Sequence, residues 1–453
     1  MKALIDQQKQ YFNSNATKPL SFRIEQLKKL KSVLKSYEQE LTDAVFKDFQ
    51  KGKFNTFLGE LAGLYNDLNN AIKKLRKWAK IKRVGTNMVN FPARSYIMPE
   101  PLGVALVIGA WNYPINLTLV PAVAAIAAGN TVVLKPSELT VHTSTVLSNM
   151  IRSNFDPSFF AVVEGGIEET TELLAQPFDK IFFTGSISVG RIVYRAAAKN
   201  LIPVTLELGG KSPLIVEPDA NLKICVKRLV WGKFVNAGQT CIAPDYVLVH
   251  KSIEKEFLET LKKEIELGQY SLENQNYAQI ISEKHLDRLV NLIEPEKVFV
   301  GGEYDRSKRL LAPTVLINTS GDDKVMEDEI FGPILPVLNY EDIDSAIAFV
   351  KSRPKPLALY LFSESSSISK KIFNELSFGG GSVNEVLMHF INDELPFGGV
   401  GSSGMGSYHG EAGFKTFSHY KSIIRKPTLF ELPLKYFPYK NWKFSMIKRV
   451  MGL

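Results

Sequence analysis

The chain lacks the features that mark several large classes of protein. Its 453 residues contain two cysteines, Cys225 and Cys241, which argues against a disulfide framework and favours a reducing, cytoplasmic setting. The run closest to a membrane span, Leu119 to Ala128, is shorter than the ~18 residues that a span needs, so no transmembrane helix is expected. The first residues have no apolar core of the kind that a secretory signal requires.

Metal and nucleic-acid sites are also not indicated. The six histidines show no metal-ligand spacing, so no metal is expected. The formal charge of +8 is modest for this length; we attribute it to scattered surface lysines, and it includes no basic arm suited to nucleic acid. A Gly-x-Ser-x-Gly elbow is absent, and a cysteine hydrolase would depend on His409 as its loop histidine.

The hydrophobic pattern predicts an α/β fold of two or three domains. Ile24 to Val45 and Leu58 to Trp78 each have the three-four apolar spacing of a long amphipathic helix, and no chemistry is assigned to either. From Val104 to Val216, near-continuous apolar strands alternate with helices, as in a parallel sheet that is covered on both faces. The alternation resumes after Cys241 and predicts a second α/β domain. In such sheets, ligands bind beyond the carboxyl ends of the strands.

The segment from Phe234 to Cys241 is the most informative stretch of the sequence. It is a polar, glycine-containing loop between an apolar helical run and the strand-like run Tyr246 to Val249. A thiol at such a junction is open to a substrate, whereas Cys225 lies inside the apolar helical pattern. We therefore interpret Cys241 as a catalytic nucleophile. From the local sequence alone, an inert thiol is the alternative.

Polar residues at the ends of the predicted strands are candidates for binding and catalysis. Asn112 follows the strand Val104 to Ile108, where its carboxamide can donate to a developing oxyanion; the alternative is a helix N-cap. Lys135 and Glu138 follow the next strand, where a carboxylate can accept hydrogen bonds from ribose hydroxyls. The alternative for these two residues is a charge pair at a helix start.

The glycine spacing favours a dinucleotide over a nucleoside triphosphate. Gly185 and Gly190 lie between a strand and a helix, where free backbone amides suit a pyrophosphate. Arg191 stands where a P-loop needs lysine, which argues against a triphosphatase. The letters of Gly399 to Gly404 match a dinucleotide fingerprint but follow no predicted strand, so we expect no cofactor site there.

Glu207 lies within an apolar strand. A buried carboxylate costs free energy unless it is paired, protonated or functional. Desolvation raises the pKa of such a group, as a general base near neutrality requires. The alternative is a buried ion pair with Lys211.

Together these segments resemble the aldehyde dehydrogenase superfamily, in particular its shorter class 3 or fatty-aldehyde branch. The resemblance covers Leu20 to His419, and its motifs, each weak alone, are specific when they occur in this order. The motifs are Trp111-Asn112-Tyr113-Pro114, Lys135-Pro136-Ser137-Glu138, Phe183-Thr184-Gly185 through Gly190, Leu206-Glu207-Leu208-Gly209-Gly210-Lys211, Gly238-Gln239-Thr240-Cys241, Glu329-Ile330-Phe331-Gly332-Pro333 and Pro396-Phe397-Gly398-Gly399.

The resemblance implies a role for each site residue. Cys241 is the expected nucleophile, Glu207 the general base and Asn112 a donor in the oxyanion hole. The expected cofactor is NAD, with NADP also accepted, because a carboxylate at position 138 repels the extra phosphate of NADP. The residues expected to hold the cofactor are Lys135, Glu138, Thr184, Gly185, Ser186, Gly190, Leu208, Glu329 and Phe331. The role of Glu329 comes from the resemblance alone.

We expect a Rossmann-like NAD(P)-binding domain at 1–80 and 99–206, a catalytic domain at 207–405, and a bridging or oligomerisation arm with a tail at 81–98 and 406–453. The chain shows no extra N-terminal segment of the kind that tetrameric relatives have, which favours a homodimer. The tail is too charged to span a membrane; it either packs on protein or lies on a membrane surface. Its apolar residues are Phe430, Leu432, Leu434, Tyr436, Phe437, Trp442, Phe444, Met446 and Ile447.

The implied reaction is NAD(P)-dependent oxidation of a hydrophobic aldehyde, medium to long chain or aromatic, to the carboxylic acid. It passes through a thiohemiacetal and a thioester on Cys241, and water activated by Glu207 hydrolyses the thioester. Two alternative functions stay open. One is a CoA-acylating dehydrogenase, against which Glu207 argues, and the other is a non-catalytic relative that keeps the fold.

Overall fold

A computed structural model describes residues 1–429 and 431–453. Phe430, one of the aromatic residues of the tail, lies outside the described residues. Contacts divide the chain into a larger unit, Met1–Trp78 with Pro101–His419, and a smaller unit, Ala79–Glu100 with Tyr420–Leu453. The finer domain boundaries expected at residues 206 and 405 stay a prediction.

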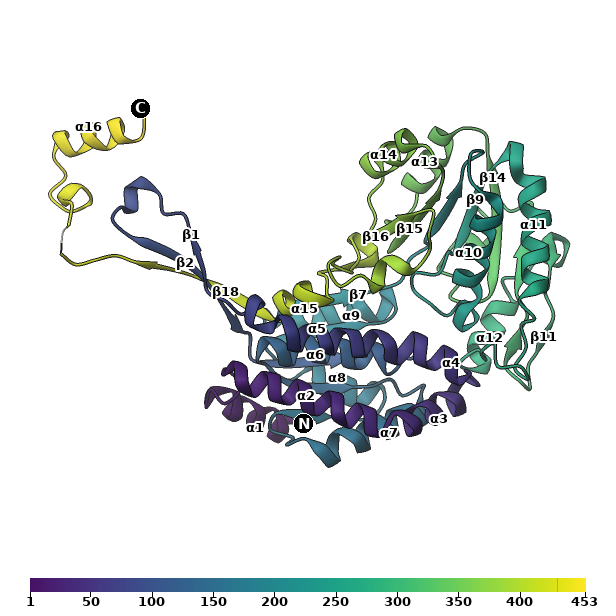
Figure 1. Ribbon diagram of the computed structural model, residues 1–453, viewed down its shortest axis with the longest axis horizontal. Helices are drawn as coiled ribbons and strands as arrows, with labels where there is room; N and C mark the ends of the chain where they lie inside the picture. Colours follow the sequence, from purple (N-terminus) through teal and green to yellow (C-terminus); the bar gives the residue numbers. More distant parts are fainter. Residues whose placement is uncertain (430) are drawn as a thin grey trace. The chain divides into compact units, whose positions relative to one another are not determined.

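The first sheet of the larger unit has six strands in the order β17-β7-β6-β3-β4-β5. Figure 1 labels one of these strands, β7, near α9. β17 runs antiparallel to β7, and the other neighbours run parallel. The apolar side chains of its central strands are buried, as expected of a sheet that is covered on both faces. The strands are β3 (Val104–Ile108), β4 (Thr131–Lys135), β5 (Phe160–Val162), β6 (Lys180–Thr184), β7 (Val204–Glu207) and β17 (Gly404–Met405).

Two groups of helices pack on this sheet. Side chains of α1, α8 and α9 join a core with β3 and β6, whereas α6 contacts β3 and β4 and packs against α2, α5 and α15. The bounds of these helices are α1 (Lys2–Asn13), α2 (Leu20–Ser36), α5 (Ala62–Trp78), α6 (Asn116–Ala128), α8 (Ile167–Leu174), α9 (Ile187–Ala198) and α15 (Gly410–Thr416). A further helix, α7 (Val141–Asn154), lies between β4 and β5 in the chain.

The prediction of two long N-terminal helices is wrong in detail. The chain turns at Tyr37 between α2 and α3 (Glu38–Phe49), and α3 ends at Gln50, whose φ is 54°. A short helix, α4 (Lys53–Thr56), and one π-helical turn, η1 (Phe57–Leu61), then lead into α5. The apolar spacing continues from α2 across Tyr37 into α3, so the pattern alone does not reveal this break.

The second sheet has seven strands in the order β10-β13-β14-β9-β8-β15-β16. Only its edge strand β10 is antiparallel to its neighbour. The strands are β8 (Pro213–Val216), β9 (Tyr246–His250), β10 (Val298–Val300), β13 (Thr314–Leu316), β14 (Ile334–Tyr340), β15 (Ala358–Phe362) and β16 (Gly380–Val383). The helices are α10 (Leu222–Phe234), α11 (Glu254–Leu267), α12 (Glu283–Val290), α13 (Ile343–Lys351) and α14 (Ser366–Glu375). The predicted fold class, with two largely parallel α/β sheets, is therefore confirmed.

The smaller unit is built on a three-stranded sheet in the order β1-β2-β18. Its strands are β1 (Lys82–Val84), β2 (Arg94–Pro101) and β18 (Ser418–Arg425), and a helix, α16 (Asn441–Val450), lies near the C-terminus. Among the helices of the described residues, none is both long and apolar enough to cross a membrane.

Candidate active site

Three consecutive residues with left-handed backbone precede Cys241. Asn236, Ala237 and Gly238 have φ angles of 55°, 52° and 71°, a conformation that is unfavourable for residues with a side chain. A Cβ atom on Gly238 would lie 2.2 Å from the carbonyl oxygen of Gly332, so only glycine fits at that position. This strained turn joins α10 to the segment that carries Cys241.

Gln239 fixes the strained loop from inside. Its side chain is 1% exposed, and its Nε2 donates to the carbonyl oxygens of Asn236 and Gln279 at 3.0 Å each. Its Oε1 accepts from the amide of Ile281 at 3.0 Å. Because every polar atom of the side chain is used, the backbone just before Cys241 has one well-defined position.

Cys241 is half-buried, whereas Cys225 is fully buried in α10, as the helical pattern predicted. Burial, together with the charges of Glu329 and Glu207, raises the pKa of the Cys241 thiol to about 12. Hydrogen bonds from the amides of Cys241 and Ile242 oppose the rise. The thiol is therefore protonated at neutral pH in the ligand-free protein, and both carboxyl groups lie close enough to influence it.

Glu207 ends β7 and is 3% exposed. Neither carboxyl oxygen has a hydrogen-bond partner within the described residues, and burial raises the pKa of Glu207 well above its ordinary value. Lys211 does not pair with it, because the Nζ atom of Lys211 lies 2.5 Å from Oδ2 of Asp245. The ion-pair alternative is therefore wrong, and the free oxygens of Glu207 can accept a proton from water.

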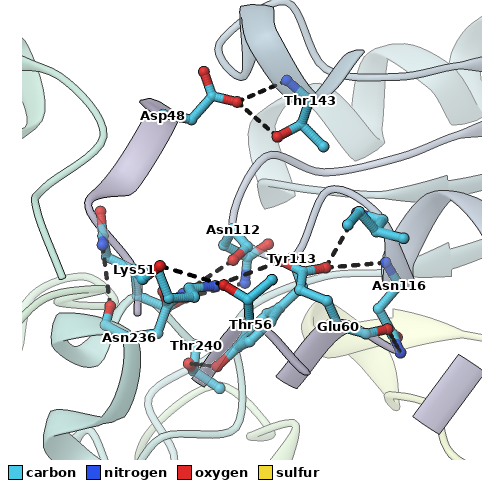
Figure 2. Close-up of polar contacts among 12 residues, drawn as sticks. Asp48, Lys51, Thr56, Glu60, Asn112, Tyr113, Asn116, Thr143, Asn236 and Thr240 are labelled. Carbon is cyan, nitrogen blue, oxygen red and sulfur yellow. Dashed lines mark hydrogen bonds and ion pairs between the residues drawn. The ribbon is translucent and has the colours of Figure 1, made fainter. Parts of the chain in front are cut away.

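Asn112 points its carboxamide toward the segment Phe234 to Cys241, called the nucleophile loop below. Its side chain is 3% exposed, and Nδ2 donates to the carbonyl oxygen of Gln239 at 3.1 Å. Asn236 in turn donates to the backbone oxygen of Asn112 at 2.9 Å (Figure 2). The N-cap residue of α6 is Ile115, so the N-cap alternative does not describe Asn112.

Lys135 and Glu138 lie at the carboxyl end of β4. Nζ of Lys135 is 3.4 Å from Oε2 of Glu138 and donates to the Pro136 carbonyl at 2.8 Å. The charge pair that was the alternative therefore exists. The Lys135 side chain is 2% exposed and that of Glu138 is 50% exposed, so the carboxylate is still accessible to a ribose hydroxyl.

The turn from β6 to α9 brings the expected phosphate-binding residues together. The Thr184 hydroxyl is buried without a partner in the described residues, and the Ser186 side chain caps the start of α9. Gly185 and Gly190 flank this helix start. A Cβ atom on Gly190 would lie 2.6 Å from Cδ2 of Leu208, so glycine allows the first turn of α9 to pack against the strand-end residue.

Glu329 lies against the glycines that follow β7. A Cβ atom on Gly209 would be 1.8 Å from Oε2 of Glu329, and burial raises the pKa of this carboxyl to about 8. Phe331 has a φ of 49°, and its ring centroid lies 5.2 Å from that of Trp111. The Glu329 carboxylate is therefore packed directly against the backbone of Gly209.

The chemistry of these side chains fits a dinucleotide. The Thr184 hydroxyl, which has no partner within the described residues, lies at the strand end before α9 and suits a pyrophosphate. The carboxylates of Glu138 and Glu329 suit ribose hydroxyls. The stretch Gly399–Gly404, whose letters match a dinucleotide fingerprint, leads instead into β17, which pairs with β7.

Asp67, Asp393 and His409 place potential metal-ligand atoms within 4.8 Å of one another. Nδ1 of His409 lies 3.2 Å from Oδ2 of Asp67, and Asn66 donates to Asp393 at 2.7 Å. Nε2 of His409 is buried without a hydrogen-bond partner in the described part of the chain. His409, the candidate partner for a cysteine hydrolase, contacts Asp67.

Asp245 is a site residue that the sequence did not reveal. Its Oδ1 accepts from the amide of Ile330 at 3.0 Å, and its partner Lys211 donates to the carbonyl of Asp328 at 2.9 Å. The pair thereby holds the backbone on both sides of Glu329. No local signal marks Asp245, because its partners lie far away in the sequence.

Comparisons with known proteins agree with this architecture. Residues 1–423 match the family model described as the aldehyde dehydrogenase family. The chain is 48% identical to 4,4'-diaponeurosporen-aldehyde dehydrogenase of Staphylococcus aureus, covering 97% of this chain and 96% of the relative. It is 45% identical to the mouse aldehyde dehydrogenase named dimeric and NADP-preferring, covering 94% of each.

A solved structure described as the substrate-bound state of Staphylococcus aureus AldH superposes with a TM-score of 0.96, at 46% identity and with 99% of each chain covered. The resemblance to the class 3 branch is thereby confirmed, since relatives named aldehyde dehydrogenase family 3 member A2 are 42–43% identical over most of the chain. The chain belongs to the aldehyde dehydrogenase family and is an NAD(P)-dependent enzyme that oxidises aldehydes.

Proposed function

We propose that Cys241, Asn112 and Glu207 carry the aldehyde oxidation, in that order of use. The Cys241 sulfur, once deprotonated, attacks the carbonyl carbon and forms a thiohemiacetal. The oxygen that becomes negative is held by the carboxamide of Asn112, a contact of a type worth ~3–4 kcal/mol in the transition state. Bound NAD(P) would supply the hydride acceptor, and loss of a hydride from the same carbon leaves a thioester on Cys241.

Glu207 releases the acid. As a carboxylate it takes a proton from a water molecule, and the resulting hydroxide-like oxygen attacks the thioester carbon. The carbon–sulfur bond breaks, the carboxylic acid leaves, and the Cys241 thiolate returns. The observation that carries this proposal is the buried Glu207 carboxyl, which has both oxygens unpartnered within the described residues and whose charge reaches Cys241.

The same observation favours water over coenzyme A as the acceptor of the acyl group. The test is to incubate the protein with an aldehyde and NAD, with and without CoA, and to follow NADH and the products. We expect the free acid to form at the same rate in both samples. A strict requirement for CoA would overturn the proposal.

The aldehyde is proposed to be hydrophobic, of medium to long chain or aromatic. Tyr113, Tyr360 and Tyr408 are buried around the nucleophile: burial raises their pKa values, and the charge of Cys241 adds to the rise. The name of the 48% identical relative, 4,4'-diaponeurosporen-aldehyde dehydrogenase, supports an aldehyde of this class. A panel of aldehydes of increasing chain length should show kcat/KM rising with length.

NAD is proposed as the preferred cofactor, with NADP also used. Glu138 presents an exposed carboxylate beside the expected ribose site, which repels a 2'-phosphate. Glu138→Gln should raise kcat/KM with NADP relative to NAD. An unchanged ratio would remove Glu138 from this role.

The protein is proposed to be a cytoplasmic homodimer. The name of the mouse relative includes the word dimeric, and the presence of only two cysteines suits a reducing compartment. Light scattering on the purified chain should give twice the monomer mass of 50.7 kDa.

The tail is proposed to rest on an anionic membrane surface. The attribution of the charge to scattered lysines is wrong, because residues 421–453 contain eight Lys and Arg side chains and one Glu, and thus carry +7 of the formal +8. Phe437 is 80% exposed, Phe444 62% and Leu453 82%. Exposed apolar groups among cations are typical of interfacial segments. We expect the protein to sediment with vesicles that contain phosphatidylserine and not with neutral vesicles. If the tail is instead buried in contacts between the two subunits, the protein will sediment with neither kind of vesicle.

A further inference from the structure

Lys51 and Glu60 form a buried ion pair that the reaction scheme does not use. Their side chains are 3% and 0% exposed, and Nζ of Lys51 lies 3.4 Å from Oε1 of Glu60. Burial lowers the pKa of Lys51 and raises that of Glu60, and each charge partly offsets the change in the other. Because desolvating two charges costs several kcal/mol per ion, the attraction between Lys51 and Glu60 is by itself weak evidence for a stabilising role. The pair therefore calls for a role beyond stability.

Glu60 fixes the start of α6. Its Oε2 accepts from the backbone amides of Ile115 and Asn116 at 3.1 Å each, and its own carbonyl accepts from Nδ2 of Asn116 at 3.3 Å. Figure 2 shows the carboxylate beneath this turn. The N-cap residue Ile115 has no side chain that can satisfy these amides, so the carboxylate acts as the cap. The π-helical turn η1 carries Glu60, and such turns are frequent at functional sites.

Lys51 supports the residue next to Asn112. Its Nζ lies 4.6 Å from the centroid of the Tyr113 ring and 5.1 Å from that of Phe49, which is cation–π geometry. The Tyr113 hydroxyl is 2.8 Å from Oγ1 of Thr240, the residue that precedes Cys241 (Figure 2). The Lys51 ammonium thus contacts the Tyr113 ring, whose hydroxyl is hydrogen-bonded to the nucleophile loop.

The ion pair contacts the segment that follows Asn112. Lys51 contacts the ring of Tyr113, the residue that follows Asn112, and Glu60 binds the backbone amide of Ile115. On its other side, Asn112 meets Gln239 of the nucleophile loop. We propose that Lys51 and Glu60 are positioning residues that set the carboxamide of Asn112 against Cys241, so that the N-terminal helices take part in oxyanion stabilisation. This inference rests on the role proposed above for Asn112.

The test is a double-mutant cycle on the full chain. Lys51→Met with Glu60→Gln removes both charges and keeps the volumes similar. It is made in the wild-type protein and in Asn112→Ala, and kcat and KM are measured for one aldehyde with NAD. With Asn112 present, we expect kcat to fall ~10-fold or more with KM little changed. With Asn112→Ala, the same two substitutions should change kcat by less than about twofold.

Alkylation of Cys241 by iodoacetamide separates this role from damage to the fold. Thiol alkylation forms no oxyanion. The alkylation rate of the variant with both Lys51→Met and Glu60→Gln should therefore stay within about twofold of the wild-type rate. Glu60→Gln alone replaces the double variant if the latter does not fold. An equal loss of kcat with and without Asn112, or a large fall in the alkylation rate, would overturn the inference.

Arg23 provides the matched control. It is 7% exposed, and its Nη1 donates to the carbonyl of Ala127 at 3.3 Å, at the other end of α6. Arg23→Met should lower stability and change kcat by the same factor in both backgrounds. If its effect also vanished in Asn112→Ala, general loosening of α6 would explain the data and the inference would be wrong. Full activity of Asn112→Ala by itself would instead refute the proposed role of Asn112.

Discussion

Glu207→Gln tests the proposed mechanism most directly. The substitution keeps the shape of a side chain that is 3% exposed but removes the only group proposed to deprotonate water. Because attack by Cys241 and loss of hydride do not use Glu207, the first turnover should survive. General-base catalysis contributes ~10²–10⁴-fold, so steady-state turnover should fall by about that factor.

The assay combines rapid mixing with mass spectrometry. The variant should release about one NADH per active site in a burst and then stall, since hydrolysis of the thioester becomes limiting. Intact-mass analysis at that stage should find the acyl group on Cys241. Unimpaired steady-state turnover, or a stalled enzyme without an acyl adduct, would refute the reasoning.

The same variant should be more stable, with a pH dependence that follows from the raised pKa of Glu207. Below the ordinary carboxyl pKa of ~4.3, the group is protonated in the folded and the unfolded chain and has no effect. As pH rises from there toward the folded pKa, only the unfolded chain ionises, and folding loses ~1.4 kcal/mol for each tenfold difference in proton affinity. Glutamine escapes this loss, so the gain in the melting temperature of the cofactor-free variant should grow as the pH is raised above the ordinary carboxyl pKa of ~4.3. A constant difference across this range would contradict the burial of an unpaired carboxyl.

Three further outcomes are expected. Cys241→Ser should abolish nearly all turnover and Cys225→Ser should not, as measured by NADH formation; equal losses would undo the assignment of the nucleophile. Asn112→Ala should lower kcat ~10²–10³-fold while leaving the melting temperature within a few degrees, and unchanged kcat would remove it from the oxyanion hole. In the cofactor-free protein, alkylation of Cys241 should accelerate ~10-fold per pH unit between pH 8 and 10, because its pKa is raised to about 12. A plateau near pH 8 would show that the thiol is activated before any ligand binds.

Much of the fold could be predicted from the sequence. Near-continuous apolar strands in alternation with helices predict parallel sheets covered by helices, because only strands that are buried on both faces lose their polar alternation. Glu207 and Cys241 were recognisable for a related reason, since a charged group within an apolar strand and a thiol within a polar loop both break the surrounding pattern. Glu60 carries a similar signal, for it lies in helical phase with Leu64 and Leu68.

Only the tertiary structure decided which charges meet. Lys211 is four residues from Glu207 but binds Asp245, and Glu329 approaches Gly209 from another part of the chain. The same is true of the path from Lys51 through Tyr113 to Thr240. Side-chain periodicity reports whether a residue is inside or outside, since that depends on its own element. It does not report partners, because these depend on how distant elements pack and on turns such as the left-handed Asn236.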